Sequence, residues 1–251
     1  MKNKLLIVLA LLFLLGGLGV FLYPSFQTAM IRQAEKGTIQ QFEEYRASAT
    51  IAESEKPDPE NEPDETVPAA ETPRAFPELW DACLAYNTQL VLSQREDFSA
   101  ESWKRAQLVL SDYGWEQEIF GYLSIPSAEI EAPLYLGGSS SSLNKGAAIL
   151  GQTSMPIGGE NTNCVIAGHR TWNGALHPFV GLENVEVGDL VYLTNPWETL
   201  RYRVVAKEII YPDNSDKVRI QEGRDLISVF TCTYPNTRRV LVTCERIIEE
   251  G

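Results

Sequence analysis

Cysteine and histidine residues that could together carry out nucleophilic chemistry follow two segments with the pattern of β-strands. A cysteine attacks a carbonyl group as its thiolate, and a histidine is the usual partner that stabilises the thiolate. His169 follows the predicted strand Cys164–Gly168, and Cys232 follows the predicted strand Leu226–Thr231. Arg239 precedes a third predicted strand and could stabilise the oxyanion that forms in acyl transfer. Residue types alone leave a second interpretation open, in which these side chains only pack or face solvent.

The remaining cysteines and histidine have simpler interpretations. Cys83, Cys164 and Cys244 fall among apolar residues and are expected to be buried thiols, and His177 is expected to be structural or solvent-facing. No two cysteines form a Cys-x-x-Cys pair and the chain has only 2 histidines, so the sequence does not favour a metal site.

These candidate residues would be positioned by a chain of short strands that begins at Gly121. Turn-forming residues separate the apolar runs, which is typical of an all-β domain. About eight strands in ~130 residues predict a mostly β fold, a closed or nearly closed barrel with short helices. The predicted strands are Gly121–Ile125, Glu129–Tyr135, Ala147–Leu150, Cys164–Gly168, Leu190–Thr194, Leu200–Val205, Leu226–Thr231 and Val240–Arg246, with Asn195–Glu198 as a hairpin turn.

The N-terminus has the pattern of a membrane anchor. Residues 5–23 contain no charge and, as a helix, would span about 28 Å, close to the thickness of a bilayer's hydrocarbon core. Lys2 and Lys4 precede this run, which predicts a cytoplasmic N-terminus and an exterior location for the rest of the chain. A cleaved signal peptide is the alternative, but the run is long for one and no clear small-x-small cleavage site follows it.

Composition divides the rest of the chain before the barrel into three parts. Residues 24–46 are expected to form a juxtamembrane helix interrupted by Gly37, and residues 47–75 an acidic, proline-rich spacer. Residues 76–118 are expected to form a helical region that includes any lid, followed by the catalytic barrel over 119–251. The net charge of −13 is uneven, because residues 47–73 hold eight acids and one base. So acidic a chain is a poor candidate for binding nucleic acid.

Two long motifs make the interpretation specific. The segment Thr153-Ser154-Met155-Pro156 through Ala167-Gly168-His169-Arg170 resembles the sequence around the catalytic histidine of class C, pilus-type sortases. The segment Val229-Phe230-Thr231-Cys232-Thr233 through Asn236-Thr237-Arg238-Arg239 is similar to the cysteine and arginine motifs of the same family. Weaker similarity extends to Gly121–Pro126, Ala85–Asn87 and Tyr23–Ser25, so the resemblance covers most of the chain except the acidic spacer.

The resemblance implies a sortase-type barrel and a role for each candidate residue. Cys232 would attack the Thr–Gly bond of an LPXTG-like sorting signal and form a thioester, and His169 would exchange protons with the leaving and entering amines. Arg239 would hold the substrate and steady the oxyanion; Arg238 is the alternative for this role. No metal or organic cofactor is implied. In a barrel of this type, Cys164 and Cys244 would lie on strands separated by a third strand, too far apart for a disulfide.

The sequence departs from the family next to the proposed site. The Asp-Pro-aromatic triplet that often marks a lid is absent, and Asp97 with Phe98 is the candidate replacement. The loop after the cysteine is short and holds Tyr234, which, with Thr231 and Trp172, is a candidate to shape the substrate groove. No second long apolar run follows, so the chain would hang from one anchor.

The resemblance implies a membrane-anchored cysteine transpeptidase with its catalytic domain outside a Gram-positive cell. Its partners would be pilins or other surface proteins with C-terminal sorting signals, and an amine acceptor on a pilin lysine. One alternative is a sortase that attaches single surface proteins to peptidoglycan cross-bridges. The other is a non-catalytic anchored scaffold that has kept the fold, because fold alone does not establish function.

Overall fold

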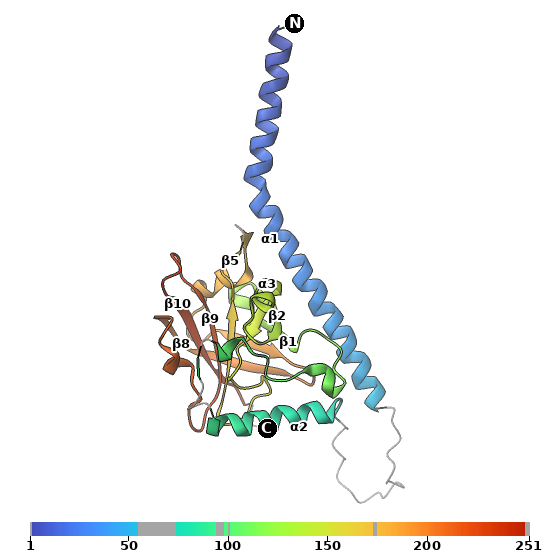
Figure 1. The fold of residues 1–251 in the computed structure, drawn as a ribbon, viewed down its shortest axis with the longest axis vertical. Coiled ribbons are helices and arrows are strands. Elements are labelled where there is room, and N and C mark those ends of the chain that lie inside the picture. The colour runs from blue at the N-terminus through green and yellow to red at the C-terminus, as the bar shows by residue number, and fades with distance from the viewer. Residues whose placement is uncertain (1, 55–73, 94–97, 100, 173–174, 249–251) are drawn as a thin grey trace, which may run out of the picture.

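The computed structural model describes residues 2–54, 74–93, 98–99, 101–172 and 175–248. A β-barrel lies beside one end of a long N-terminal helix, and a second helix lies across the barrel's lower end in the view of Figure 1. The helices are α1 (Lys2–Ser54), α2 (Pro77–Ser93) and α3 (Ser140–Lys145). The strands are β1 (Gly121–Ile125), β2 (Ile130–Leu136), β3 (Ala147–Ile149), β4 (Thr162–Gly168), β5 (Thr171–Trp172), β6 (Ala175–Leu176), β7 (Leu190–Thr194), β8 (Thr199–Ile210), β9 (Asp225–Cys232) and β10 (Arg239–Arg246).

Eight strands close the barrel in the order β1-β2-β3-β4-β9-β10-β8-β7, while β5 and β6 form a separate hairpin. The predicted closed eight-stranded barrel is therefore confirmed, and all but one of its strand boundaries lie within two residues of the prediction. The β2–β3 and β4–β9 pairs are parallel, and the other pairs are antiparallel. The small β5–β6 hairpin was not predicted, because two-residue strands carry no detectable hydrophobic alternation.

Strand β8 is the main exception to the predicted boundaries. The sequence predicted a strand over Leu200–Val205, but β8 continues to Ile210. Its second half alternates partly buried and exposed side chains and pairs with β10 across an irregularity between Thr243 and Cys244. The turn before it, between β7 and β8, has the predicted position: Asn195 Oδ1 accepts the backbone N–H groups of Trp197 and Glu198, each at 2.9 Å.

Helix α1 is longer and more regular than the sequence predicted. It runs without a break through Pro24 and Gly37 to Ser54, so the expected interruption at Gly37 is wrong. Eight residues assigned to the spacer, 47–54, are helical, and the rest of that acidic stretch, 55–73, lies outside the described residues. Burial of Glu35 before Gly37, and of Ile39 and Phe42 after it, supports the helix on both sides of this glycine, because packing outweighs glycine's low propensity.

The region between the spacer and the barrel is only partly helical. Beyond α2 it forms two short 3₁₀ turns, Ser102–Lys104 and Leu110–Tyr113, where the sequence predicted a second helix. The apolar residues of this segment pack onto the barrel instead of along a helix, as Trp103, Leu108 and Leu110 all contact its hydrophobic clusters. Tertiary packing thus decides the conformation of this segment.

The core joins both helices to the barrel. Phe42 of α1 is fully buried and lies 5.6 Å from Trp115, measured between ring centroids. In α2, Asn87 is buried, and its side-chain amide exchanges two hydrogen bonds with the backbone of Met155, at 2.7 and 3.3 Å. Met155 belongs to the segment that leads into β4. This contact therefore attaches α2 to the start of the strand whose far end carries His169.

Candidate active site

The parallel pair β4 and β9 brings His169 and Cys232 together. Ala167 of β4 stands opposite Phe230 of β9, and two more residues in the same register place His169 beside Cys232. Between them, the buried Thr231 hydroxyl donates a 2.8 Å hydrogen bond to the Gly168 carbonyl. This bond joins the two strands at the positions directly before the histidine and the cysteine, and so limits how far their ends can separate.

Arg239 meets the cysteine from the other side. It is the first residue of β10 and pairs directly with Cys232, the last residue of β9. Residues opposite each other in an antiparallel pair have Cα atoms about 4.5–5.5 Å apart. Adjacent strand ends therefore hold the histidine, the cysteine and the arginine along one edge of the barrel.

All three residues line one cavity of about 360 Å³. Most of its lining is apolar, so an extended peptide could bury its side chains there while its scissile carbonyl reached the polar end. The lining residues come from the barrel, from the segment after β8 and from the 3₁₀ turn Ser102–Lys104: Trp103, Lys104, Gly138, Leu143, Leu150, Ala167, Gly168, His169, Ile210, Tyr211, Pro212, Asn214, Ser215, Val218, Phe230, Thr231, Cys232 and Arg239.

Partial burial changes the electrostatics of His169. Desolvation lowers the pKa of His169 below its usual 6.5, because burial disfavours the charged imidazolium. His177 is buried behind it, 3 % exposed, with the two ring centroids 6.1 Å apart and nearly perpendicular. Burial and the neighbouring His169 lower the pKa of His177 as well. Of the two expected alternatives for His177, structural or solvent-facing, its burial and its ring contact with His169 support the structural one.

The two consecutive arginines point to different places. Arg239 is half-buried and lines the cavity, and its Nη1 donates to the Arg238 carbonyl at 3.1 Å. Arg238 is exposed: its guanidinium lies 5.0 Å from the Tyr211 ring centroid and donates to the Tyr211 hydroxyl at 3.3 Å. The geometry therefore favours Arg239, and not Arg238, as the cation that meets a substrate in the cavity.

The 3₁₀ turn at Trp103 forms a wall of the cavity that the sequence analysis missed. The Trp103 carbonyl accepts the backbone N–H groups of Gly138 at 2.8 Å and Gly151 at 2.9 Å, so the turn is tied to two barrel loops. The two neighbouring side chains, Trp103 and Lys104, then border the cavity. The available signal was an aromatic residue in the segment expected to hold a lid, but its docking depends on glycines far along the chain.

The other candidate groove residues are scattered. Asp97 lies outside the described residues, and Phe98 does not line the cavity but packs on Trp103, with ring centroids 5.5 Å apart. Trp172 belongs to β5, and its side chain lies outside what the structure describes. Tyr234 is 85 % exposed and does not line the cavity. Of this group, Thr231 alone is placed in the cavity wall.

The remaining cysteines are separate from this site. Cys83, Cys164 and Cys244 are buried free thiols, as expected, and burial raises the pKa of Cys83 to about 12. Ile227 of β9 pairs with both Cys164 and Cys244, which confirms that a third strand separates these two cysteines. Within the described residues, no group of three or more His, Cys, Asp or Glu side chains is arranged to hold a metal ion.

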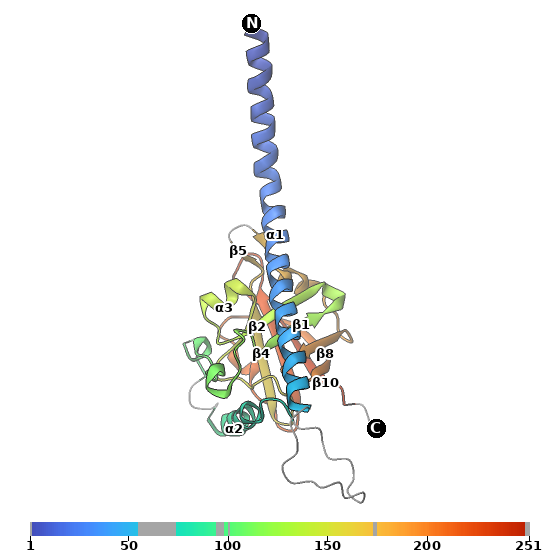
Figure 2. The ribbon, with the colours of Figure 1, turned by 90° about the vertical axis from the view of Figure 1, so that its right-hand side faces the viewer.

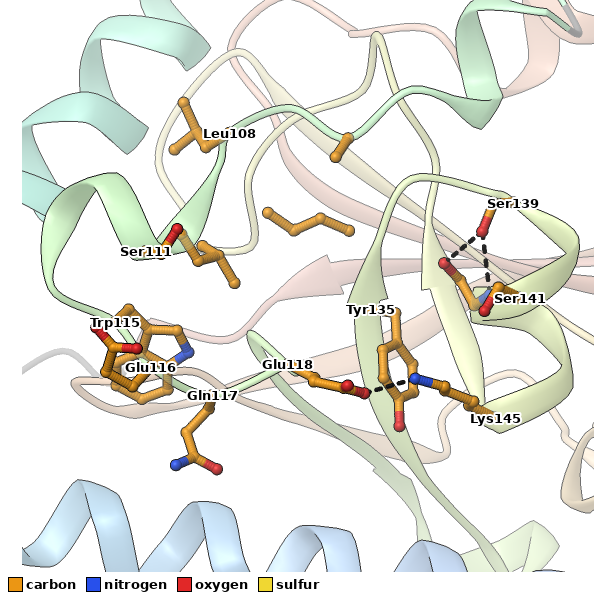
Figure 3. Close-up of a pocket in the computed structure, with 14 residues that line it drawn as sticks. Leu108, Ser111, Trp115, Glu116, Gln117, Glu118, Tyr135, Ser139, Ser141 and Lys145 are labelled. Atoms are coloured by element: carbon orange, nitrogen blue, oxygen red, sulfur yellow. Dashed lines mark hydrogen bonds and ion pairs between the residues drawn. The ribbon is translucent and has the colours of Figure 1, made fainter.

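A second cavity, shown in Figure 3, lies on another face between the 3₁₀ turn Leu110–Tyr113 and α3. Its charged groups pair with each other, since Lys145 Nζ lies 2.6 Å from Glu118 Oε2. Its serines do the same, with 2.9 Å between the hydroxyls of Ser139 and Ser142. The cavity contains no cysteine or histidine, so the cavity at Cys232 is the better candidate for chemistry.

Comparison with known proteins identifies the class. The family model described as Sortase domain matches residues 123–247. A crystal structure of Streptococcus pneumoniae sortase C superposes with a TM-score of 0.64 and 30% sequence identity, over 84% of this chain and 96% of that chain. The barrel, the paired strand ends and these matches together show that the chain belongs to the sortase family.

Within the family, the similar structures include several class C enzymes. Sortase C from Clostridium perfringens has a TM-score of 0.61 and 28% identity over 84% of this chain and 99% of that chain. Sortase A of Streptococcus agalactiae is 27% identical over 131 residues, 51% of this chain and 52% of that protein. The match thus spans about half the length of this curated relative, while the class C structures also match the helical region before the barrel.

Proposed function

We propose that this protein is a membrane-anchored cysteine transpeptidase that cleaves an LPXTG-like sorting signal and transfers the acyl part to an amine. The register at the strand ends carries the proposal, because Cys232 lies beside His169 and directly opposite Arg239. One cavity exposes all three groups to the same peptide. Membership of the sortase family supports this choice of reaction.

The proposed reaction has two half-reactions. The Cys232 sulfur attacks the threonine carbonyl, the C–N bond to glycine breaks, and the thiol proton passes through His169 to the leaving amine. A neutral His169 can accept that proton, and its lowered pKa keeps it mainly neutral at pH 7. An incoming amine then attacks the thioester, forms an amide bond and returns a proton through His169 to the sulfur. Arg239 neutralises the oxyanion in both steps.

We infer the topology from the N-terminal helix. Within the described residues, α1 is long and apolar enough to cross a membrane, and its exposed leucine, valine and phenylalanine side chains have no protein partner to cover them. Lys2 and Lys4 before the apolar run favour a cytoplasmic N-terminus and an exterior barrel.

The proposed acyl donor and acceptor are pilin subunits, with a pilin lysine as the attacking amine. The match to class C sortases over the helical region and the barrel supports this, since the S. pneumoniae structure is described with respect to pilin substrate specificity. Attachment of single surface proteins to peptidoglycan is the second candidate, favoured by the missing Asp-Pro-aromatic triplet. The two differ in product: a ladder of pilin polymers or one wall-linked protein.

The first test uses the full chain in detergent with fluorogenic LPXTG-type peptides, read by intact-protein mass. We expect an acyl adduct that maps to Cys232 and is absent from Cys232→Ala, while His169→Ala should form it far more slowly. The three other cysteines are buried and serve as internal controls. Absence of adduct and cleavage over a panel of sorting signals, in protein with a native thermal unfolding transition, would favour the non-catalytic scaffold.

A further inference from the structure

The candidate site opens at one defined end of the barrel. Strands β4 and β9 both run toward that end, since they are parallel and finish at Gly168 and Cys232. Strand β1 runs the same way: it is antiparallel to β2, β2 is parallel to β3, and β3 is antiparallel to β4. The Ile125 end of β1 and the cysteine end of β9 therefore lie at the same end of the barrel.

Helix α1 runs antiparallel to β1 along the barrel wall. Phe42 of α1 lies 6.0 Å from Tyr122 near the start of β1, measured between ring centroids. Ten residues earlier in α1, Arg32 shares a small cavity with Ser124 and Pro126 at the other end of β1. Following α1 backward toward its apolar run thus leads past the end of the barrel at which the candidate site opens. Both views show the N-terminal part of α1 extending beyond the barrel on the side where β5 lies (Figures 1 and 2).

The site end of the barrel lies close to the apolar run of α1, and the same uninterrupted helix joins the two. The buried face of α1 includes Glu35, Ile39 and Phe42, and Ile31 is the first apolar residue after the apolar run that is partly buried. Ile31 follows Tyr23, the end of the apolar run, by eight residues, which corresponds to about 12 Å of helix. The headgroup layer on each side of a bilayer is roughly 5–7 Å thick. An uninterrupted helix therefore holds the site end of the barrel next to the headgroups.

One of the loops at this end, between β9 and β10, has the composition of a membrane interface, while the neighbouring segment after β8 carries the exposed acids Asp213 and Asp216. Thr233–Arg238 contains no acidic residue; its Tyr234 is 85 % exposed and its Arg238 is exposed beside Tyr211, itself 59 % exposed. Tyrosine and arginine favour the boundary between lipid and water, and arginine pairs with lipid phosphates. Glu53, the first acid of the acidic stretch, belongs to the C-terminal turn of α1, at the opposite end of the barrel-bound part of that helix.

We propose that the cavity at Cys232 faces the bilayer, with the loop Thr233–Arg238 against the lipid headgroups and α1 as a rigid strut that sets its height. The enzyme would then act on peptide segments that lie at the membrane surface. The proposal rests on the proposed membrane anchoring of α1, and its test needs no catalytic activity.

The test places one fluorescent label in the full chain reconstituted into phosphatidylcholine–phosphatidylglycerol nanodiscs that contain a headgroup nitroxide lipid. In a Cys232→Ala background the other native cysteines are buried, so Asn236→Cys labels the loop selectively. The matched control is Glu222→Cys, an exposed position just before β9 at the opposite end of the barrel. We expect several-fold stronger quenching at position 236 than at position 222.

A second variant tests the strut. Seven helix-forming residues inserted after Ser25 lift the barrel by about 10 Å and nearly preserve the direction of its docked face. We expect this insertion to remove the quenching at position 236, whereas the same seven residues added at the N-terminus should leave it unchanged. Equal quenching at 236 and 222, or quenching that survives the insertion after Ser25, would overturn the proposal. Failure of the chain to enter nanodiscs would instead refute the anchor itself.

Discussion

At the residue scale, the site depends on the last residue of one strand and the first residue of the next. Cys232 and Arg239 pair across the β9–β10 ladder, so the separation of their Cα atoms is set by backbone hydrogen bonding, and the Arg239 side chain is held by its hydrogen bond to the Arg238 carbonyl. Six residues connect them, and Thr233 closes this loop with hydrogen bonds to the Arg238 backbone. A cation fixed in this way is pre-organised for an oxyanion at the cysteine.

This arrangement makes different predictions for the two arginines. Arg239→Lys keeps the charge but loses the planar, two-pronged donor set, so we expect kcat/KM for an LPXTG-type peptide to fall about 100-fold. Arg238→Lys is the matched control: the Arg238 side chain contacts the cavity-lining Tyr211 but does not itself line the cavity, and we expect a change of no more than about twofold. Steady-state kinetics on both variants checks this. Larger damage from Arg238→Lys would mean that the roles are reversed.

The pH dependence follows from the burial of His169. The thiol and imidazole pair must hold one proton in total for the proposed chemistry, and a second proton on the imidazole blocks it. Because burial lowers the pKa of His169, activity should rise with pH through an acid limb whose midpoint lies below 6.5. The pH profile of kcat/KM measures this midpoint. A midpoint above 6.5 would mean that another charge stabilises the imidazolium.

At the scale of elements, the docked turn Ser102–Lys104 adds a wall to the cavity that the barrel strands do not supply. Its conformation depends on close approach by glycines: a Cβ atom at Gly151 would lie 2.3 Å from the Arg105 carbonyl oxygen and 2.4 Å from that of Ser102. Both contacts are with backbone atoms, so no side-chain rotation can relieve them. Glycine at 151 therefore permits Trp103 to reach the cavity wall.

We expect Gly151→Ala to displace this turn. The overpacking should lower the free energy of unfolding by about 1–3 kcal/mol and raise KM for the peptide more than it lowers kcat, because the turn forms a wall and holds no reacting group. Gly37→Ala is the matched control, since no atom lies within 4 Å of that Cβ position and alanine favours the helix by about 1 kcal/mol. Denaturant unfolding and peptide kinetics test the pair, and an unchanged KM in Gly151→Ala would count against the wall.

At the scale of the whole molecule, the docking of α1 on the barrel decides where the site can act. This interface buries a carboxyl group: Glu35 is 3 % exposed and its Oε2 has no hydrogen-bond partner. Burial raises the pKa of Glu35 to about 8, against an opposing effect of Arg32. The docked helix therefore holds a neutral carboxylic acid at pH 7.

Glu35 should make the stability of the protein depend on pH. Its folded-state pKa lies above the unfolded value of 4.5, so its contribution is fully present below pH 4.5 and is lost as pH rises toward 8. The slope is at most about 1.4 kcal/mol per pH unit. Glu35→Gln removes this titration, and we expect it to stabilise the full chain progressively more between pH 5 and 8. Thermal unfolding in detergent across this range measures the difference; parallel curves would show that Glu35 is solvated.

The sequence by itself determined the elements with regular local patterns. Short apolar runs bounded by turn-forming residues marked all eight barrel strands, including β4, whose seven residues are all buried. The uncharged run before Pro24 marked the helix that we propose as the membrane anchor, and the segments at His169 and Cys232 marked the family. Each of these signals is a short stretch of sequence, and the two family motifs occur in the order expected of the family. They can therefore be recognised without knowing which residues are in contact.

Only the tertiary structure decided the features that depend on distant contacts. The segment at Trp103 forms a 3₁₀ turn and not the predicted helix, because the Trp103 carbonyl bonds to glycines about 35 and 48 residues away. Helix α1 continues through Gly37 because the helix packs on the barrel. The tertiary structure also turned Arg239 into the cavity and Arg238 onto Tyr211, and it buried His177 behind His169. Local propensity cannot predict such results, because the free energy that selects them comes from burial and hydrogen bonds that exist only after the chain has folded.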